Sequence, residues 1–286
     1  MILALFTVVM LGPFTKAGYD FIIEAKSSPN MPKDYVFPDI TDMKITAVAS
    51  VFFAGIEVVM RGVFYKLFVP FCKEQQDLKV REKRSGKAAF CIYKVFYFLT
   101  ATAWGYFVLK DQYYFPKYLG GSGDFDRGFE EHPYPKHAPQ LKEYLLVTMG
   151  YHVGGLVTHF FGDRKADFLE MGLHHIVALY LFGGCYMFNG WEVGSTIAFL
   201  HDIADITTNM VKTLSESKDK VIIGPLFALH MAIWFYTRLC VLPYLIVKVF
   251  IIRDSIYMGT GSNSVIVIPF FCWLLGCMFV LHCYWF

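Results

Sequence analysis

The sequence predicts an all-α membrane protein that crosses the bilayer about seven times. Hydrophobic residues make up 56% of the 286, aromatic residues 18% and charged residues only 17%, a balance too apolar for an ordinary soluble domain of this size. A membrane-spanning helix needs about 20 consecutive, mostly apolar residues. Seven stretches meet this requirement, with approximate bounds 45–71, 88–109, 142–161, 172–189, 192–212, 222–250 and 264–286.

The segment before the first of these stretches is predicted to lie at the membrane surface. Residues 1–13, MILALFTVVMLGP, are too short to cross a bilayer, and no Lys or Arg precedes the apolar run as in a secretory signal. We therefore expect an interfacial helix within an N-terminal segment 1–44. The region 45–86 is predicted to be a peripheral first membrane helix with a basic loop, beside a single domain over 87–286.

The first membrane helix carries two charged residues within its apolar run. Glu57 and Arg61 are four residues apart, in the order that favours an ion pair along a helix. A charge at the bilayer centre costs about 2.5 to 3.5 kcal/mol, so such residues are normally paired. Two interpretations stay open: the pair is neutralised within its own helix, or it docks this helix against the rest of the protein.

The loop charges predict an orientation, because basic residues are held on the cytoplasmic or equivalent side during insertion. Loop 73–87 carries six basic and three acidic residues, whereas loop 110–140 carries four basic and five acidic residues. We expect the N-terminus outside, with loop 73–87, the short connection 162–170 and the C-terminus inside.

The composition and the motifs exclude several classes of protein. A formal net charge of +2, with no stripe of basic residues, argues against nucleic-acid binding. The seven cysteines have no C-x-x-C spacing, so neither a disulfide framework nor a metal site is predicted. The chain also lacks the G-x-S-x-G, H-E-x-x-H and Walker-type glycine motifs of serine hydrolases, zinc proteases and ATPases.

Ionisable residues interrupt the fourth and fifth membrane stretches. His174 and His175 are adjacent, so on a helix they point about 100° apart, and one of them can face a cavity while the other contacts a neighbouring helix. The fourth and fifth stretches are joined by only FNGWE, residues 188–192, which makes the two helices antiparallel neighbours. Their polar residues are therefore expected to face one another.

The fifth stretch contributes a polar stripe along nearly three helical turns. His201 and Asp205 are in positions i and i+4, Asn209 is at i+8, Lys212 lies three residues further on, and Asp202 lies beside the stripe. An imidazole can remove a proton, return it or attack a carbonyl, and a hydrogen-bonded carboxylate fixes its tautomer and supports its charged form. Acyl transfer needs all of these steps.

These residues carry a resemblance to a known family. The run DRKADFLEMGLHHIVALYLFGGCYMFNGWEVGSTIAFLHDIADITTNMVK, residues 163–212, resembles the Lag motif of the longevity-assurance ceramide synthases of the TLC-domain superfamily. Similarity continues in WFYTRLCVLP, residues 234–243, and more weakly upstream, so that it covers about 87–250. A double histidine followed by H-D-x-x-D at this separation is a specific signal.

The resemblance implies a fold and a reaction. The fold would be a barrel-like bundle of six helices around a long cavity, formed by a TLC domain over 87–286, with the first membrane helix outside. The reaction would transfer a fatty acyl group from acyl-CoA, as co-substrate, to the amine of a sphingoid base, with no further cofactor. The apolar cavity would hold the acyl chain, and the basic inner loops would attract the CoA phosphates.

The resemblance also implies roles for individual residues. His174 or His175 would be the base or the acyl-accepting nucleophile, activated and positioned by three residues of the fifth stretch, His201, Asp202 and Asp205. Four further residues are predicted to bind substrate: Asn209, Lys212, Trp234 and Arg238.

Two positions depart from the family pattern. Glu192 stands where the family usually has an arginine, and Asn209 stands where it often has a glutamate. An alternative function therefore stays open, in which the chain is a non-catalytic lipid-binding protein or a structural subunit of a large membrane complex. The enzyme would work in the endoplasmic reticulum, with membrane lipids around it and a homodimer as one arrangement, whereas the subunit could belong to a mitochondrial inner membrane.

Overall fold

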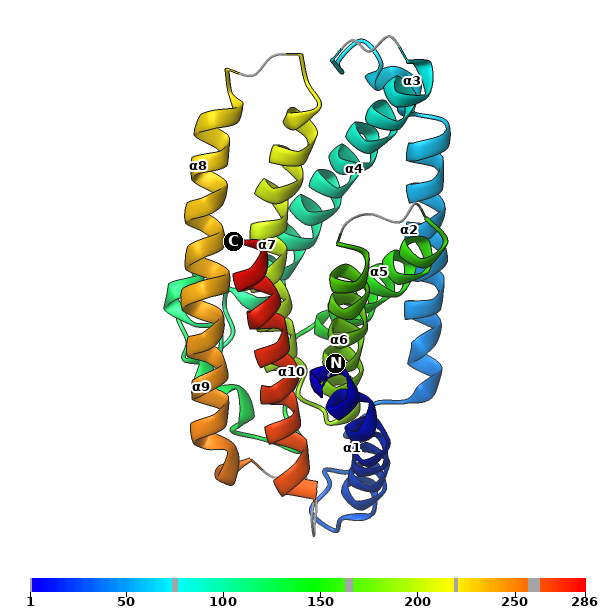
Figure 1. Cartoon of the computed structure of the whole chain (residues 1–286). Coiled ribbons are helices and arrows are strands. Elements are labelled where there is room, and N and C mark those ends of the chain that lie inside the picture. Colours follow the sequence, from blue (N-terminus) through cyan, green and yellow to red (C-terminus); the bar gives the residue numbers. More distant parts are fainter. Residues whose placement is uncertain (1, 74–76, 163–166, 219–220, 257–262) are drawn as a thin grey trace.

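The computed structural model describes residues 2–73, 77–162, 167–218, 221–256 and 263–286, and it confirms the all-α membrane fold. Within these ranges the chain forms helices that run roughly along one long axis, and no strand is present (Figure 1). Five helical segments in this part of the chain are long and apolar enough to cross a membrane: Ile40–Gly62, Leu78–Leu109, Phe168–Met187, Ile223–Ser255 and Ile266–Trp285.

Each of the seven predicted stretches contains helix. The helices are α2 (Met43–Gly62), α4 (Leu78–Leu109), α5 (Leu141–Phe161), α6 (Phe168–Met187), α7 (Trp191–Ser215), α8 (Ile223–Trp234), α9 (Leu242–Ile252) and α10 (Asn263–Trp285). Helices α5 and α7 are of similar length to the five apolar segments, but they are more polar because they carry several of the residues described below. Helix α2 ends nine residues before the predicted bound, and a short helix α3 (Tyr65–Phe68) follows it.

The N-terminal helix is longer than the sequence predicts. Helix α1 covers Ile2–Ser27, twice the length of the predicted surface segment. Its buried residues Phe14, Ala17, Phe21 and Ala25 recur every three or four positions, so that they form one apolar stripe. The stripe packs against α6 and α10, where the Phe14 ring lies 5.2 Å from that of Phe271. The apolar run MILALFTVVMLGP, residues 1–13, ends just before the first residue of this stripe.

Helices α8 and α9 form one continuous rod, as the single stretch 222–250 predicts (Figure 1). They are joined by a π-helical segment, Phe235–Val241, in which the wider turn brings Thr237 and Arg238 into the interior. Such segments are rare and are frequently found at functional sites.

Helix α2 packs on α5 through small residues. A Cβ atom added to Gly150 would lie 2.6 Å from the Cβ of Ala49, so only glycine allows the two backbones to approach this closely. Further along the same contact, Arg61 Nε donates to Glu57 Oε1 at 3.0 Å, and the Thr158 hydroxyl of α5 donates to Glu57 Oε2 at 2.7 Å. Glu57 therefore pairs with Arg61 within its own helix and also helps to hold α2 against α5, so both interpretations of the pair apply.

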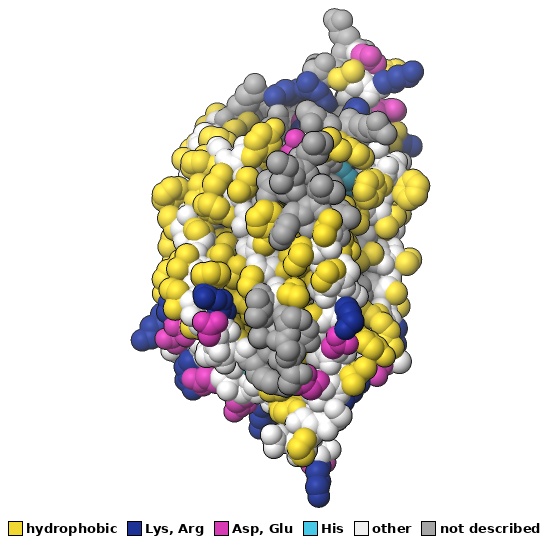
Figure 2. Space-filling model, turned by 60° about the horizontal axis from the view of Figure 1, so that its bottom comes forward, with side chains coloured by type: hydrophobic (Ala, Val, Ile, Leu, Met, Phe, Trp, Pro, Cys, Tyr) yellow, Lys and Arg dark blue, Asp and Glu magenta, His cyan; other side chains and the backbone are white. Residues whose placement is uncertain are grey.

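Helix α3, the beginning of α4, the end of α7 and the beginning of α8 lie together at the upper end of the molecule in Figure 1. Residues 163–166 of the predicted inner connection 162–170 fall outside the described residues. Glu216, after α7, ties this end together, because Lys87 Nζ donates to its carboxylate at 2.6 Å and the Lys73 amide donates to its carbonyl at 3.0 Å. Figure 2 shows apolar side chains over the flank and most of the charged side chains towards the two ends.

Candidate active site

The interior of the bundle contains a cavity of about 90 Å³ between α6, α7 and α10, with further contributions from α5 and α9. Most of its lining is apolar. The polar residues that line it are His152, His174, His201, Asp202 and Asp205.

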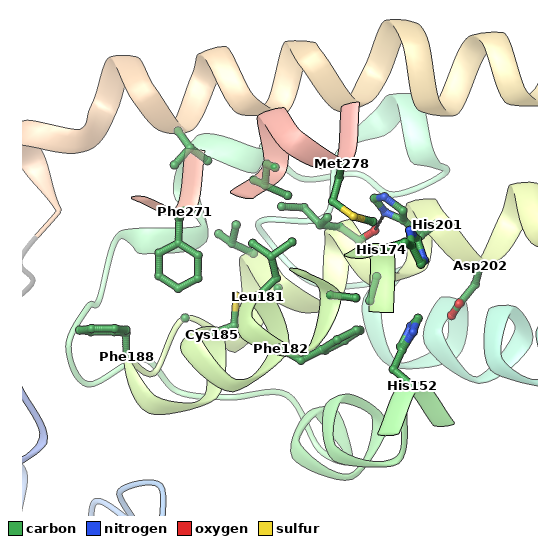
Figure 3. Close-up of a pocket in the computed structure, with 18 of the residues that line it drawn as sticks. His152, His174, Leu181, Phe182, Cys185, Phe188, His201, Asp202, Phe271 and Met278 are labelled. Carbon is green, nitrogen blue, oxygen red and sulfur yellow. Dashed lines mark hydrogen bonds between the residues drawn. The ribbon is translucent and has the colours of Figure 1, made fainter. Parts of the chain in front are cut away.

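The cavity has one apolar and one polar end. In Figure 3, Phe188, Cys185 and Phe271 lie on one side, towards the α6–α7 turn, whereas His152, His174, His201 and Asp202 lie together on the other. The polar end is towards the basic loops, because residues 201–212 of α7 run in that direction. The cavity therefore offers an apolar channel with ionisable groups at the end nearest the basic loops.

Asp202 and Asp205 have different surroundings. Asp202 is buried, with 3% of its surface exposed, and accepts a hydrogen bond of 3.1 Å from the hydroxyl of Tyr144 on α5. The Asp205 carboxylate pairs with Arg238 Nη2 at 3.2 Å. A buried carboxylate needs such donors, because leaving it without a partner in a medium of low dielectric constant is costly.

Arg238 joins three elements at the polar end. It is 1% exposed, and besides Asp205 it donates to the backbone oxygen of His201 at 2.8 Å and to His282 Nε2 of α10 at 2.9 Å. His201 in turn contacts Ile197 O through Nδ1 at 2.7 Å and His282 Nε2 through its own Nε2 at 3.2 Å. The orientation of the His201 ring is therefore fixed on both sides.

His174 and His175 differ in position, as the 100° spacing predicts. His174 lines the cavity, and its ring centre lies 6.3 Å from that of His282 and 6.3 Å from that of His152. His175 does not line the cavity and instead lies against α5, where its ring is 3.1 Å from the position that a Cβ on Gly155 would take. His174 is the one of the two that can reach a molecule in the cavity.

None of the four residues predicted to bind substrate lines the cavity. Asn209 is buried and donates to the backbone oxygen of Asp205 at 2.7 Å, whereas Lys212 is exposed further along α7. The indole of Trp234 donates to the backbone oxygen of His282 at 3.3 Å, and Arg238 lies behind the lining residues. Three of them support the walls of the site, and Lys212 lies outside it.

Three residues of the site were missed by the sequence analysis: His152, Tyr144 and His282. Tyr144 and His152 lie on α5 and His282 lies on α10, whereas the predicted histidines and aspartates lie on α6 and α7. Each of the three is the only ionisable residue of the site within its own helical turn. The presence of His152 and His282 within apolar membrane stretches is the signal that could have identified them.

Glu192 belongs to a second polar cluster, at the opposite end of α7. Its Oε1 atom lies 2.8 Å from Nδ1 of His137, and Nε2 of the same ring lies 3.0 Å from Oδ1 of Asn189. Both nitrogens of His137 are thus within hydrogen-bonding distance of side-chain oxygens, which fixes the orientation of the ring. Asn189 also donates to Tyr35, and burial raises the pKa of the Tyr35 hydroxyl.

The two departures from the family pattern thus have structural explanations. Glu192 holds the loop 132–137 against the α6–α7 turn and takes no part in the polar end of the cavity. Asn209 bonds to the backbone of its own helix. Neither residue removes a group from the histidine and aspartate cluster.

Comparison with known proteins identifies the family. A model of the TLC domain matches residues 87–286, which is more than half of the chain. The chain belongs to the TLC-domain family. The polar residues of α6 and α7, the cavity and the rod with Arg238 all lie within the matched TLC domain.

Several curated proteins resemble this TLC-domain chain. It is 30% identical to ceramide synthase 4 of Mus musculus over 158 residues, and these residues cover 55% of the chain and 39% of the relative. It is 28% identical over 190 residues to sphingosine N-acyltransferase lac1 of Schizosaccharomyces pombe, covering 62% and 47%. ASC1-like protein 3 of Oryza sativa is 23% identical over 248 residues, covering 84% and 85%. The chain thus spans less than half the length of the first two relatives.

Proposed function

We propose that this chain is a ceramide synthase-like N-acyltransferase, which moves a fatty acyl group from acyl-CoA to the amine of a sphingoid base. The observation that carries the proposal is the cavity, in which His174, His201, Asp202 and Asp205 gather at one end of an apolar channel. The channel suits a hydrocarbon chain, and the histidines suit the proton transfers of amide formation. The names of the relatives support this choice of substrates.

The residues take the following roles in the proposed reaction. The amine nitrogen forms a bond to the acyl carbon while the bond from that carbon to sulfur breaks. The amine loses one proton, and the CoA thiolate gains one. His174 is placed to act as the base or as the acyl acceptor, because it reaches the cavity and His175 does not. Asp202 and Asp205 line the same end of the cavity, where they are held by Tyr144 and Arg238 respectively.

The basic end of the molecule is the proposed entrance for CoA. Lys212 is exposed beyond the polar end of the cavity. The segment 73–87, predicted to be a loop, carries six basic residues, and from Leu78 onward it forms the first turns of α4 at the same end of the molecule. These charges attract the phosphates of CoA and leave the acyl chain to enter the apolar channel. On this proposal the protein works in the endoplasmic reticulum membrane, with its substrates as its only obligatory partners.

The test is acyl transfer by the purified full chain in lipid nanodiscs. The protein is incubated with labelled acyl-CoA and a sphingoid base, and the amide product is counted. We expect His174→Ala and Asp205→Asn to lower the rate by about 100-fold or more, the usual contribution of an acid or base group.

His230→Gln is the matched control. His230 bonds to Thr207 at 3.1 Å outside the cavity, so its replacement should preserve the rate. Folding of each variant is checked by its elution volume and melting temperature. Product formed at the same rate by wild type and by both folded site variants would refute catalysis and favour the non-catalytic subunit.

A further inference from the structure

His152 is a polar lining residue of the cavity to which the proposed reaction assigns no role. It lies on α5, and in Figure 3 its ring points towards the side on which His174, His201 and Asp202 lie. Its ring centre is 6.3 Å from that of His174. A molecule at the polar end of the cavity therefore meets His174 from α6 and His152 from α5.

His152 forms no hydrogen bond with any residue that the structure describes. Its Nδ1 atom is buried without a partner, and the same holds for Nδ1 of His174. The other polar lining residues have partners, as described above: Asp202, Asp205 and His201. The unused hydrogen-bonding capacity at the polar end is therefore concentrated on two imidazoles.

Two imidazoles with unpaired nitrogens suit a ligand that has two neighbouring polar groups. A neutral imidazole has one nitrogen that donates and one that accepts, and a buried group of this kind is costly to leave unpaired. A hydroxyl group satisfies either nitrogen, because it both donates and accepts. The acceptor of the proposed reaction has hydroxyl groups on the carbon atoms next to its amine-bearing carbon, whereas the thioester of acyl-CoA offers no donor. The acceptor is therefore the substrate that fits both rings.

We propose that His152 binds a hydroxyl group beside the amine of the sphingoid base, so that the protein selects an amino alcohol over a plain alkylamine of the same length. This inference rests on the proposed function and deepens it. With the hydroxyl group on His152, the amine lies towards His174, the residue that reacts in the proposed mechanism. His152 is thus a specificity-determining residue, which holds the acceptor in place and forms no covalent bond with it.

The position of the His152 ring is set by aromatic packing. Its centre lies 5.2 Å from the ring of Phe182 and 5.6 Å from the ring of Tyr151. These contacts orient the side chain without using its nitrogens. A phenylalanine at position 152 would keep an aromatic ring in the same place and remove both nitrogens, which separates packing from hydrogen bonding.

The test compares acceptors in acyl transfer by the purified full chain in lipid nanodiscs. The acceptors are an amino diol of the sphingoid type, its two analogues that each lack one hydroxyl group, and the alkylamine that lacks both. We expect wild type to lose about tenfold in kcat/KM when the hydroxyl group that His152 binds is removed, the usual effect of one hydrogen bond. In His152→Phe, kcat/KM for the amino diol should fall by about tenfold, whereas the value for the analogue without that hydroxyl group should stay the same.

His152→Gln and His159→Gln are the matched variants. The glutamine amide at position 152 can still donate and accept, so it should recover part of the preference for the amino diol. His159 lies on the same helix, where its Nε2 is 2.8 Å from the Phe168 backbone oxygen outside the cavity, so His159→Gln should keep the wild-type preference. Equal kcat/KM values for all acceptors in wild type would overturn the inference, and so would an equal loss on every acceptor in a folded His152→Phe.

A second measurement does not depend on the reaction. The melting temperature is recorded with each amine in the nanodiscs and without acyl-CoA, because a ligand that binds the folded state stabilises it. We expect the amino diol to raise the melting temperature of wild type more than the alkylamine does, and the two amines to have equal effects on His152→Phe. Equal effects on wild type would overturn the inference even if acyl transfer occurs. If wild type shows no acyl transfer, the proposed function fails, and the melting temperatures alone decide whether His152 selects the hydroxyl group.

Discussion

Arg238 is the residue on which most of the polar end depends, because one guanidinium contacts α7, α10 and the Asp205 carboxylate. We expect Arg238→Met to destabilise the protein by about 3 to 5 kcal/mol, the usual cost of removing one partner of a buried ion pair. The measurement is thermal unfolding in detergent at a fixed lipid concentration. Arg127→Met is the control, since the Arg127–Glu130 pair is half-exposed and contributes about 1 kcal/mol or less. Equal melting temperatures for the two variants would contradict this assignment.

Glu192 provides a test of the second polar cluster. We expect Glu192→Arg, which introduces the usual residue of the family, to lower the melting temperature, because it would bury a cation and remove the oxygen that faces His137 Nδ1. Glu192→Gln should be much milder, since its amide oxygen can still accept from His137 Nδ1. A Glu192→Arg protein as stable as wild type would show that the Glu192–His137 contact does not hold the α6–α7 turn in place.

At the scale of residues, the sequence predicts a group when its members recur within one helix. The stripe from His201 to Asp205 follows helical spacing, and the cavity contains both residues. Tyr144 and His282 follow no such spacing, because they meet α7 only after α5 and α10 have packed against it. The 100° separation of His174 and His175 predicts that they face different surroundings, but only the packing shows which one reaches the cavity.

At the scale of elements, the α2–α5 contact depends on the absence of a side chain at Gly150. We expect Gly150→Ala to separate the two helices, because its Cβ would lie 2.6 Å from that of Ala49 and 2.8 Å from the Thr46 oxygen. Overpacking of this kind costs about 1 to 3 kcal/mol.

The matched control is Gly55→Ala on the exposed face of α2, where no atom lies within 4 Å of the added Cβ. This variant should be neutral or stabilising, since alanine favours helix by about 1 kcal/mol over glycine. Both effects can be read from melting temperatures. A Gly150→Ala protein as stable as Gly55→Ala would show that α2 is not held by close backbone contact.

The limits of the elements were harder to predict than their existence. Hydropathy predicts a helix at each of the seven stretches, because the apolar runs have the length that a bilayer requires. It does not predict the end of α2 at Gly62 or the extension of α1 to Ser27. The end of α1 depends on Phe21 and Ala25, whose stripe continues through a more polar sequence and becomes evident only in the packed structure.

At the scale of the whole molecule, the charge distribution predicts which end faces the cytoplasm. The sequence contains no Asn-x-Ser/Thr acceptor for glycosylation, so an introduced acceptor gives an unambiguous signal. We expect an acceptor in a flexible insertion at Gly121 to be glycosylated during synthesis with microsomes. The same insertion at Lys79 should stay unmodified. The reverse pattern would show that the basic end lies in the lumen.

The docking of α1 has a consequence for the diversity of this family. Phe14 packs against Phe188 and Phe271, two residues that close the apolar end of the cavity, yet α1 precedes the matched domain by about 60 residues. The rings at the apolar end of the cavity are thus supported partly by a segment that the shared domain does not contain. On the proposed function, two proteins identical from residue 87 onward could therefore differ in the acyl chains that they accept, solely because their leading helices carry different side chains.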